Sequence, residues 1–129
     1  MKIIIAGGRN FKPTCSDRFR LIRALKKYKC TEVVSGAAAG ADAFGEEIAV
    51  KLGIPVKSFP AEWNNFNADN VFIKTNSNGT KYNTLAGFNR NQKMAEYADA
   101  VYLFPGGSGT ADMLKRAKKH NLKILRDGT

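Results

Sequence analysis

The chain has 129 residues, of which 43% are hydrophobic, and it carries a net charge of +10 at pH 7. This length suits a single domain, covering residues 1–129, with a core of its own. The apolar runs are too short for a membrane span or a signal peptide, so we expect a cytoplasmic protein with no membrane partner.

Metal-ligating residue types are scarce. The chain has a single histidine, His120, and two cysteines, Cys15 and Cys30, whose spacing matches no metal motif. We therefore expect no metal site, no bound cofactor and two reduced thiols.

The positive charge is concentrated in two segments that are expected to be helical. They are residues 18–29, with Arg18, Arg20, Arg23, Lys26, Lys27 and Lys29, and residues 115–123, with Lys115, Arg116, Lys118, Lys119 and Lys123. Such runs are usually the solvated faces of amphipathic helices. The alternative is that they attract a nucleotide or a nucleic acid by long-range electrostatics.

The first half of the chain alternates between strand and helix patterns. An isoleucine-rich run over 2–6 predicts a buried strand, and residues from about 16 to 28 predict a helix with Thr14 or Ser16 as its cap. A strand over 31–35, a helix from about 41 to 52 and a strand over 56–59 follow. Gly53 and Pro55 are expected to end that second helix.

The second half begins with a segment that shows neither the helical nor the strand pattern of hydrophobic residues. Residues from about 60 to 88 are rich in asparagine, with Trp63, Phe66, Phe72 and Tyr82 among polar residues. We expect a long loop here, either an ordered lid over a binding site or a flap without fixed structure. A helix over 89–97, a strand over 101–104, a helix from about 110 to 120 capped by Thr110, and a strand over 122–125 complete the chain.

This alternation predicts an α/β fold. We expect a Rossmann-like three-layer sandwich around a mostly parallel five-stranded sheet whose strands, numbered along the chain, lie in the order 3-2-1-4-5. In such sheets the ligand crevice lies at the carboxyl ends of the strands where the order reverses, here between the first and fourth strands.

Three glycine-bearing turns follow strands at this edge. Their expected ligand-binding residues are Gly7, Gly8, Ser35, Gly36, Gly40, Asp42, Pro105, Gly106, Gly107, Ser108, Gly109 and Thr110. Exposed N–H groups beside a helix N-terminus form an anion site, so the turns predict a phosphate-bearing or nucleotide-like ligand. None matches the P-loop or the dinucleotide fingerprint. The alternative is that they are ordinary strand-to-helix turns.

The motifs resemble those of the YspA-like branch of the SLOG superfamily, whose Rossmann-like members are related to the LOG (lysine-decarboxylase-like) and DprA/Smf proteins. The matching stretches are Gly7-Gly8-Arg9-x-Phe11, Ser35-Gly36-x-Ala38-x-Gly40-Ala41-Asp42, Arg90-Asn91-x-x-Met94 and Pro105 to Met113. The resemblance implies nucleotide-derived ligand binding in the crevice, with Arg90 and Asn91 taking part. We expect Arg9 or Arg90 to pair with a phosphate, and Asp42 to accept from a ribose hydroxyl or to cap its helix.

The resemblance leaves three functions open. The first is a nucleotide-binding sensor or sequestering protein without strong catalysis. The second is a nucleoside-monophosphate phosphoribohydrolase like the LOG enzymes, with Arg90 and Asp112 as catalytic candidates, because Met113 stands where those enzymes have a glutamate. The third is single-stranded DNA binding, which the DprA-like turn at 35–42 raises. A homo-oligomer is expected from the relatives.

Overall fold

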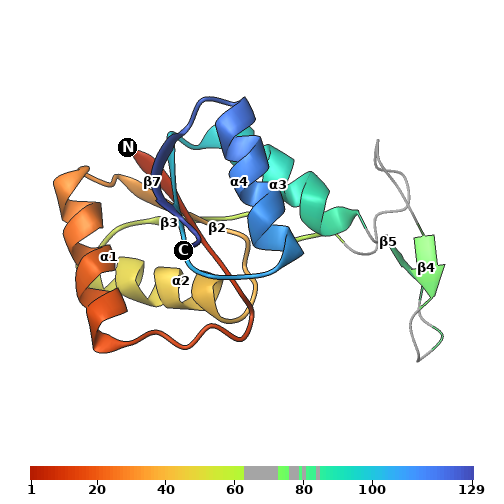
Figure 1. Cartoon of the computed structure of the whole chain (residues 1–129), viewed down its shortest axis with the longest axis horizontal. Helices are drawn as coiled ribbons and strands as arrows, with labels where there is room; N and C mark the ends of the chain where they lie inside the picture. Colours follow the sequence, from red (N-terminus) through yellow and green to blue (C-terminus); the bar gives the residue numbers. More distant parts are fainter. Residues whose placement is uncertain (63–72, 76–78, 80, 84) are drawn as a thin grey trace.

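Strands and helices alternate along the chain, apart from three successive strands in its middle (Figure 1). The computed structural model describes residues 1–62, 73–75, 79, 81–83 and 85–129. The elements are β1 (Lys2–Ala6), α1 (Cys15–Lys27), β2 (Glu32–Ser35), α2 (Ala41–Leu52), β3 (Val56–Ser58), β4 (Ile73–Thr75), β5 (Lys81–Asn83), α3 (Ala86–Tyr97), β6 (Ala100–Leu103), α4 (Ser108–Lys119) and β7 (Lys123–Asp127).

Five of these strands form one parallel sheet in the order β3-β2-β1-β6-β7. The same five segments were predicted to pair in this order, and only the numbering differs, because β4 and β5 intervene in the chain. β1 lies at the centre, with Ile4 opposite Val34 of β2 and Val101 of β6. Its isoleucines are fully buried, as expected for a strand covered on both faces.

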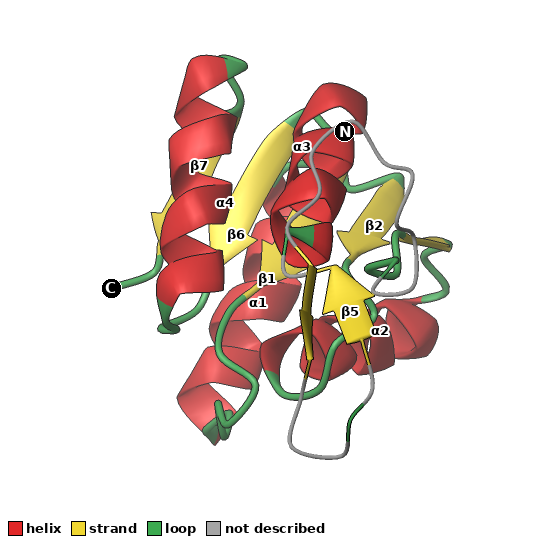
Figure 2. Ribbon diagram, turned by 90° about the vertical axis from the view of Figure 1, so that its right-hand side faces the viewer, coloured by secondary structure: helices red, strands yellow, loops and turns green. Residues whose placement is uncertain are grey.

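Helices cover both faces of the sheet, which confirms the predicted three-layer α/β class (Figure 2). Successive residues of a strand point to opposite faces. Ile3 and Ile5 therefore pack with the apolar residues of α1 and α2, whereas Ile4 packs with those of α3 and α4. Alternate residues of β1 and β6 therefore pack into two separate cores, one on each face of the sheet.

The helix boundaries confirm some sequence predictions and correct others. Thr14 caps α1 in a capping box with Asp17, and Gly53 ends α2 in the left-handed conformation with φ of 71°. The prediction that Thr110 caps the last helix is wrong: α4 begins at Ser108, and its N-cap is Gly107, without a side-chain cap. α3 also begins earlier than predicted, at Ala86.

The segment between β3 and α3 contains a β-hairpin that the sequence analysis did not predict. β4 and β5 pair antiparallel, with Lys74 opposite Tyr82, and Figure 1 shows them beyond the N-terminal end of α3. Strands of three residues are too short to establish an alternating hydrophobic pattern. Trp63, Phe66 and Phe72 lie outside the described residues, so the expectation of a lid or a flap stays a prediction.

Within the described ranges, no helix is long and apolar enough to cross a membrane. The same ranges contain no group of three or more histidine, cysteine, aspartate or glutamate residues suited to hold a metal ion. Cys15 is exposed and Cys30 half-buried, and both are free thiols. Burial raises the pKa of the Cys30 thiol, so this thiol is less reactive than an ordinary exposed one.

Candidate functional site

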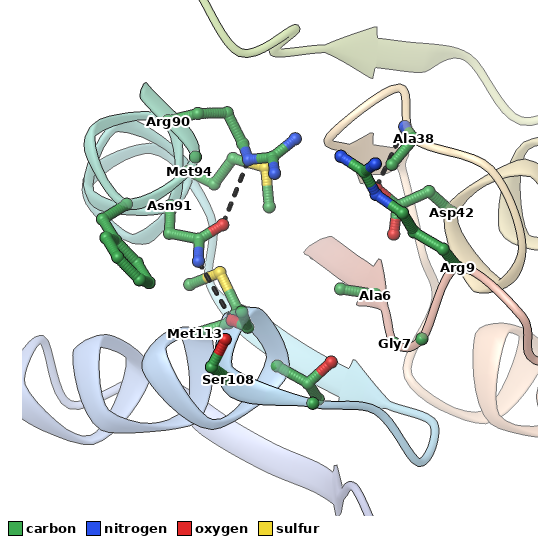
Figure 3. Close-up of a pocket in the computed structure, with 16 residues that line it drawn as sticks. Ala6, Gly7, Arg9, Ala38, Asp42, Arg90, Asn91, Met94, Ser108 and Met113 are labelled. Atoms are coloured by element: carbon green, nitrogen blue, oxygen red, sulfur yellow. Dashed lines mark hydrogen bonds between the residues drawn. The ribbon is translucent and has the colours of Figure 1, made fainter. Parts of the chain in front are cut away.

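A pocket of about 350 Å³ lies at the carboxyl ends of β1 and β6, where the strand order reverses (Figure 3). Four parts of the chain line it. They are the end of β1 and its loop (Ala6, Gly7, Gly8 and Arg9), the β2–α2 segment (Ala38 and Asp42), α3 (Gly87, Phe88, Arg90, Asn91 and Met94) and the start of α4 (Gly107, Ser108, Gly109, Thr110 and Met113). This is the crevice that the strand order predicts.

Main-chain hydrogen bonds connect the three glycine turns to one another. The Gly8 N–H donates to the Pro105 carbonyl at 2.9 Å, and the Ala41 N–H donates to the Gly8 carbonyl at 3.1 Å. Gly40 has φ of 76°, and a Cβ there would overlap the main-chain oxygens of Gly8 and Arg9. Only glycine allows this close approach of two backbones.

The N-terminal ends of three helices meet at the pocket. Their N-cap residues are Gly40, Leu85 and Gly107, and no side chain caps any of the three helices. At α4 the first intrahelical bond runs from Ala111 N–H to the Gly107 carbonyl at 3.1 Å. The N–H groups of Ser108, Gly109 and Thr110 precede it, so they have no acceptor within the helix. Together with the positive ends of the helix dipoles, they favour an anion.

Arg90 reaches from α3 into this space, and Arg9 approaches it from the opposite side (Figure 3). One terminal N–H group of Arg90 donates to the Gly36 carbonyl at 2.5 Å, and its Nε–H donates to Asn91 Oδ1 at 3.1 Å. Burial lowers the pKa of the Arg90 guanidinium, Asp42 partly offsets this, and Arg9 lowers it further. A guanidinium remains charged at any physiological pH, so the pocket holds a partly desolvated cation.

Asp42 places a carboxyl group in the same pocket, although it is 5% exposed. Its Oδ2 accepts from the Ala38 N–H at 3.3 Å. Burial raises the pKa of Asp42 to about 6, against the lowering effects of the Ala38 N–H and of Arg90. Buried groups whose pKa is shifted toward neutrality are concentrated at functional sites.

Gly36 lies close to both Arg90 and Asp42. A Cβ at Gly36 would overlap the Arg90 guanidinium and come within 2.8 Å of Asp42 Oδ2. A side chain at this position would therefore displace the Arg90 guanidinium or the Asp42 carboxylate. Gly106 has a comparable role, because a Cβ there would overlap Thr110 Oγ1 and lie 2.7 Å from the Gly8 nitrogen.

Ten of the predicted site residues line the pocket: Gly7, Gly8, Arg9, Asp42, Arg90, Asn91, Gly107, Ser108, Gly109 and Thr110. The other predicted residues, Ser35, Gly36, Gly40, Pro105, Gly106 and Asp112, are not among the lining residues. Ser35 is fully buried, and its Oγ accepts from the Ala37 N–H at 3.1 Å. The Asp112 carboxylate accepts from Asn91 and Arg116.

The apolar part of the pocket was not predicted from the sequence. Met94 and Met113 are each 1% exposed and belong to the core that α3 and α4 share, and they also line the pocket beside Phe88. Met94 and Met113 both stood in quoted motifs, but their side chains could not be assigned to a pocket before α3 and α4 were placed. A ligand with an anionic end would also find an apolar surface here.

The fold and the pocket define a Rossmann-like α/β domain with a glycine-lined crevice at the switch point of its parallel sheet. Residues 1–66 match the YspA, cpYpsA-related SLOG family, and the chain belongs to that family. It is also similar in structure to DNA processing protein A from Helicobacter pylori, which was solved to show how that protein binds single-stranded DNA. The TM-score is 0.61 at 20% identity, over 99% of this chain and 68% of that one, a likeness of fold. A comparison with curated proteins found no match.

Proposed function

We propose that the chain binds a nucleotide or nucleotide-derived ligand in the crevice, as a sensor or a sequestering protein. The observation that carries the proposal is the meeting of three uncapped helix N-termini with Arg90 in one pocket. In this arrangement a phosphate accepts from the N–H groups at the start of α4, and a guanidinium supplies charge-assisted hydrogen bonds.

The glycines at the start of α4 support close contact with the ligand. A Cβ at Gly107 or Gly109 would meet no atom within 4 Å, so the packing of the chain does not require glycine at either position. Both residues line the pocket. A ligand that lies directly on the main chain of α4 explains why neither position carries a side chain.

The remaining walls suit the rest of a nucleotide. The Asp42 carboxyl group can accept from a sugar hydroxyl, and the partly exposed ring of Phe88 offers an apolar surface to a base. Inorganic phosphate would contact only the anion site formed by Arg90 and the start of α4.

Hydrolysis of an N-glycosidic bond is the second candidate function, favoured by one observation. Asp42 is the only carboxylic acid among the described residues that line the pocket, and its pKa of about 6 suits general acid–base catalysis. Met113 lines the pocket at the position where LOG enzymes have a glutamate. Any hydrolysis would therefore depend on Asp42.

Single-stranded DNA binding is the third candidate. It is supported by the net charge of +10 and by the fold shared with the Helicobacter pylori protein. Binding through phosphate contacts would weaken steeply with salt, as counterions are released.

A thermal-shift screen tests the proposal. We expect one or more of AMP, ADP, ADP-ribose and NAD to raise the melting temperature, because a ligand that binds only the native state stabilises it. Arg90→Ala should abolish the shift, whereas Arg20→Ala, an exposed residue of α1, should leave it intact. Release of free base by the shifted sample would favour hydrolysis. No shift with any nucleotide, together with salt-dependent oligonucleotide binding, would overturn the proposal in favour of DNA binding.

A further inference from the structure

A chain of polar side chains joins α3 to α4 behind the pocket. Asn91 Nδ2 donates to the Gly109 carbonyl at 3.1 Å and to Asp112 Oδ2 at 3.0 Å. Arg116 donates from Nε to the same Asp112 oxygen at 2.8 Å and from a terminal nitrogen to Gln92 Oε1 at 2.9 Å. The chain of contacts thus starts at a pocket residue and ends outside the pocket.

The hydrogen-bonding capacity of Asn91 is almost fully used by the protein. Asn91 is 5% exposed, both of its amide N–H groups have acceptors, and its Oδ1 accepts from Arg90 Nε. An amide offers two donors and two lone pairs, so a single lone pair is left for a ligand. The partners also determine the orientation of the amide, because the reverse orientation would place its oxygen against two acceptors.

The two groups that Asn91 holds are the two parts of the anion site. Its oxygen fixes the guanidinium of Arg90, and its nitrogen fixes the carbonyl of Gly109 in the first turn of α4. One side chain therefore contacts both the cation on α3, which the Gly36 carbonyl also holds, and the first turn of α4. Asp112 fixes Asn91 in turn, from outside the pocket.

We propose that Asn91 and Asp112 are positioning residues for the anion site, and that Asp112 acts on Arg90 through Asn91. The inference rests on the proposed anion-binding function, and it gives Asp112 a role other than catalysis. Asp112 would then be needed for binding although it touches no ligand. A contact that merely fastens α3 to α4 would affect stability without affecting the order of Arg90.

The first test needs no ligand. In the wild-type protein the Arg90 Nε–H is hydrogen-bonded, so its exchange with water, followed by NMR, should be slow compared with that of exposed arginines. Asp112→Ala should speed this exchange several-fold, and Asp112→Asn, which keeps an oxygen acceptor for Asn91, should change it less. Glu47→Ala is the matched control, because Glu47 also pairs with a cation four residues later, Lys51, but neither Lys51 nor its other partner, Arg18, lines the pocket, whereas Asp112 contacts Asn91.

The second test measures affinity for inorganic phosphate from the backbone amide shifts of Ser108, Gly109 and Thr110. Asp112→Ala should weaken binding about 3- to 10-fold, the size expected for one hydrogen bond. Asn91→Ala should weaken it at least as much. In the double variant Asp112→Ala should add nothing to Asn91→Ala, because residues that act in series are not additive.

Each outcome separates this inference from the proposed function. If phosphate shifts none of these amides in the wild-type protein, the anion site itself is contradicted, and the inference with it. If phosphate binds and Arg90→Ala abolishes binding, but Asp112→Ala changes neither affinity nor Arg90 exchange, the site stands and the positioning role is refuted. Additive losses in the double variant would also refute it, because Asp112 would then act independently of Asn91.

Discussion

Substitution by alanine should change the melting temperature in opposite directions at Gly106 and at Gly109, two glycines of the same turn. Gly109 lies in the first turn of α4, and a Cβ there meets no atom within 4 Å. Alanine is favoured over glycine within helices by about 1 kcal/mol, and we expect about 0.5–1 kcal/mol in a first turn. Unfolding entropy for 129 residues is about 0.27 kcal/mol per degree, so Gly109→Ala should raise the melting temperature by about 2–4 °C.

Gly106→Ala should instead destabilise the protein. Its Cβ would overlap Thr110 Oγ1 and lie 2.7 Å from the Gly8 nitrogen, and main-chain atoms cannot move away as a flexible side chain would. Overpacking of this kind costs about 1–3 kcal/mol, which corresponds to a melting temperature about 4–11 °C lower.

At Gly109 the same substitution that stabilises the protein should weaken ligand binding. The new methyl group would occupy space that we assign to the ligand, and loss of a hydrogen bond to a charged group costs about 1.5–3 kcal/mol, or roughly 10- to 100-fold in affinity. The assay is calorimetric titration with the nucleotide that gives the largest thermal shift. A Gly109→Ala protein that is more stable and binds with unchanged affinity would refute the placement of the ligand on α4.

Three further predictions concern charge, packing and capping. The pKa of Asp42 is raised to about 6, so the native state holds this proton more tightly than the unfolded chain, and the stability that the proton provides is lost as the pH rises from about 4 to 6. Asp42→Asn should therefore stabilise the protein at pH 7.5 by about 2–3 kcal/mol, with the gain vanishing below pH 4 in thermal melts; a pH-independent difference would contradict this. Gly36→Ala should displace Arg90 and weaken nucleotide binding at least about tenfold while circular dichroism stays native, and wild-type affinity would contradict the role of Gly36. Thr14→Ala removes the capping box with Asp17 and should lower the melting temperature by about 4 °C without affecting binding; an unchanged melting temperature would show that the box is energetically neutral.

The pH dependence of Asp42 involves several neighbours. Arg90 from α3 lowers the pKa of Asp42, as do the N–H groups of Gly36 and Ala38 in the β2–α2 loop, whereas Glu46 of α2 raises it, and desolvation outweighs all of them. A buried carboxylate that reduces stability at neutral pH is difficult to explain by folding alone. This cost is consistent with selection for a ligand contact.

The sheet was predictable because its signals are local. The isoleucine-rich run over 2–6 is typical of a strand buried on both faces, and Gly53 followed by Pro55 is typical of a helix end. Alternation of strands and helices then limits the topology to a few arrangements. The hairpin of β4 and β5 lacks such signals, since each strand has three residues.

At the start of α4, Thr110 lines the pocket although its predicted role as a helix cap is wrong. Thr110 was predicted as a cap because hydroxyl residues favour that position. The helix begins two residues earlier, at Ser108, so Thr110 supplies an N–H group from its first turn. The prediction of an anion site at this turn does not depend on which residue is the cap.

The relations between Arg90, Asn91 and Asp112 could not be predicted, because they depend on how α3 packs against α4. The spacing of Asp112 and Arg116 indicates an ion pair within one helix. Nothing in the sequence indicates that Asn91, 21 residues away from Asp112, binds the same carboxylate. Similarly, only the folded chain brings the Arg90 guanidinium to the Gly36 carbonyl.

The most direct test of the account is a two-dimensional NMR titration with the nucleotide selected by thermal shift. We predict that the largest shifts fall on the backbone amides of Ser108, Gly109 and Thr110 and on the Nε–H of Arg90. The three amides have no acceptor within α4, and the Arg90 Nε–H reports on the guanidinium that lines the same pocket. Shifts confined instead to the exposed basic residues of α1 and of the C-terminal half of α4 would contradict the account, because the ligand would then bind by surface charge and not in the crevice.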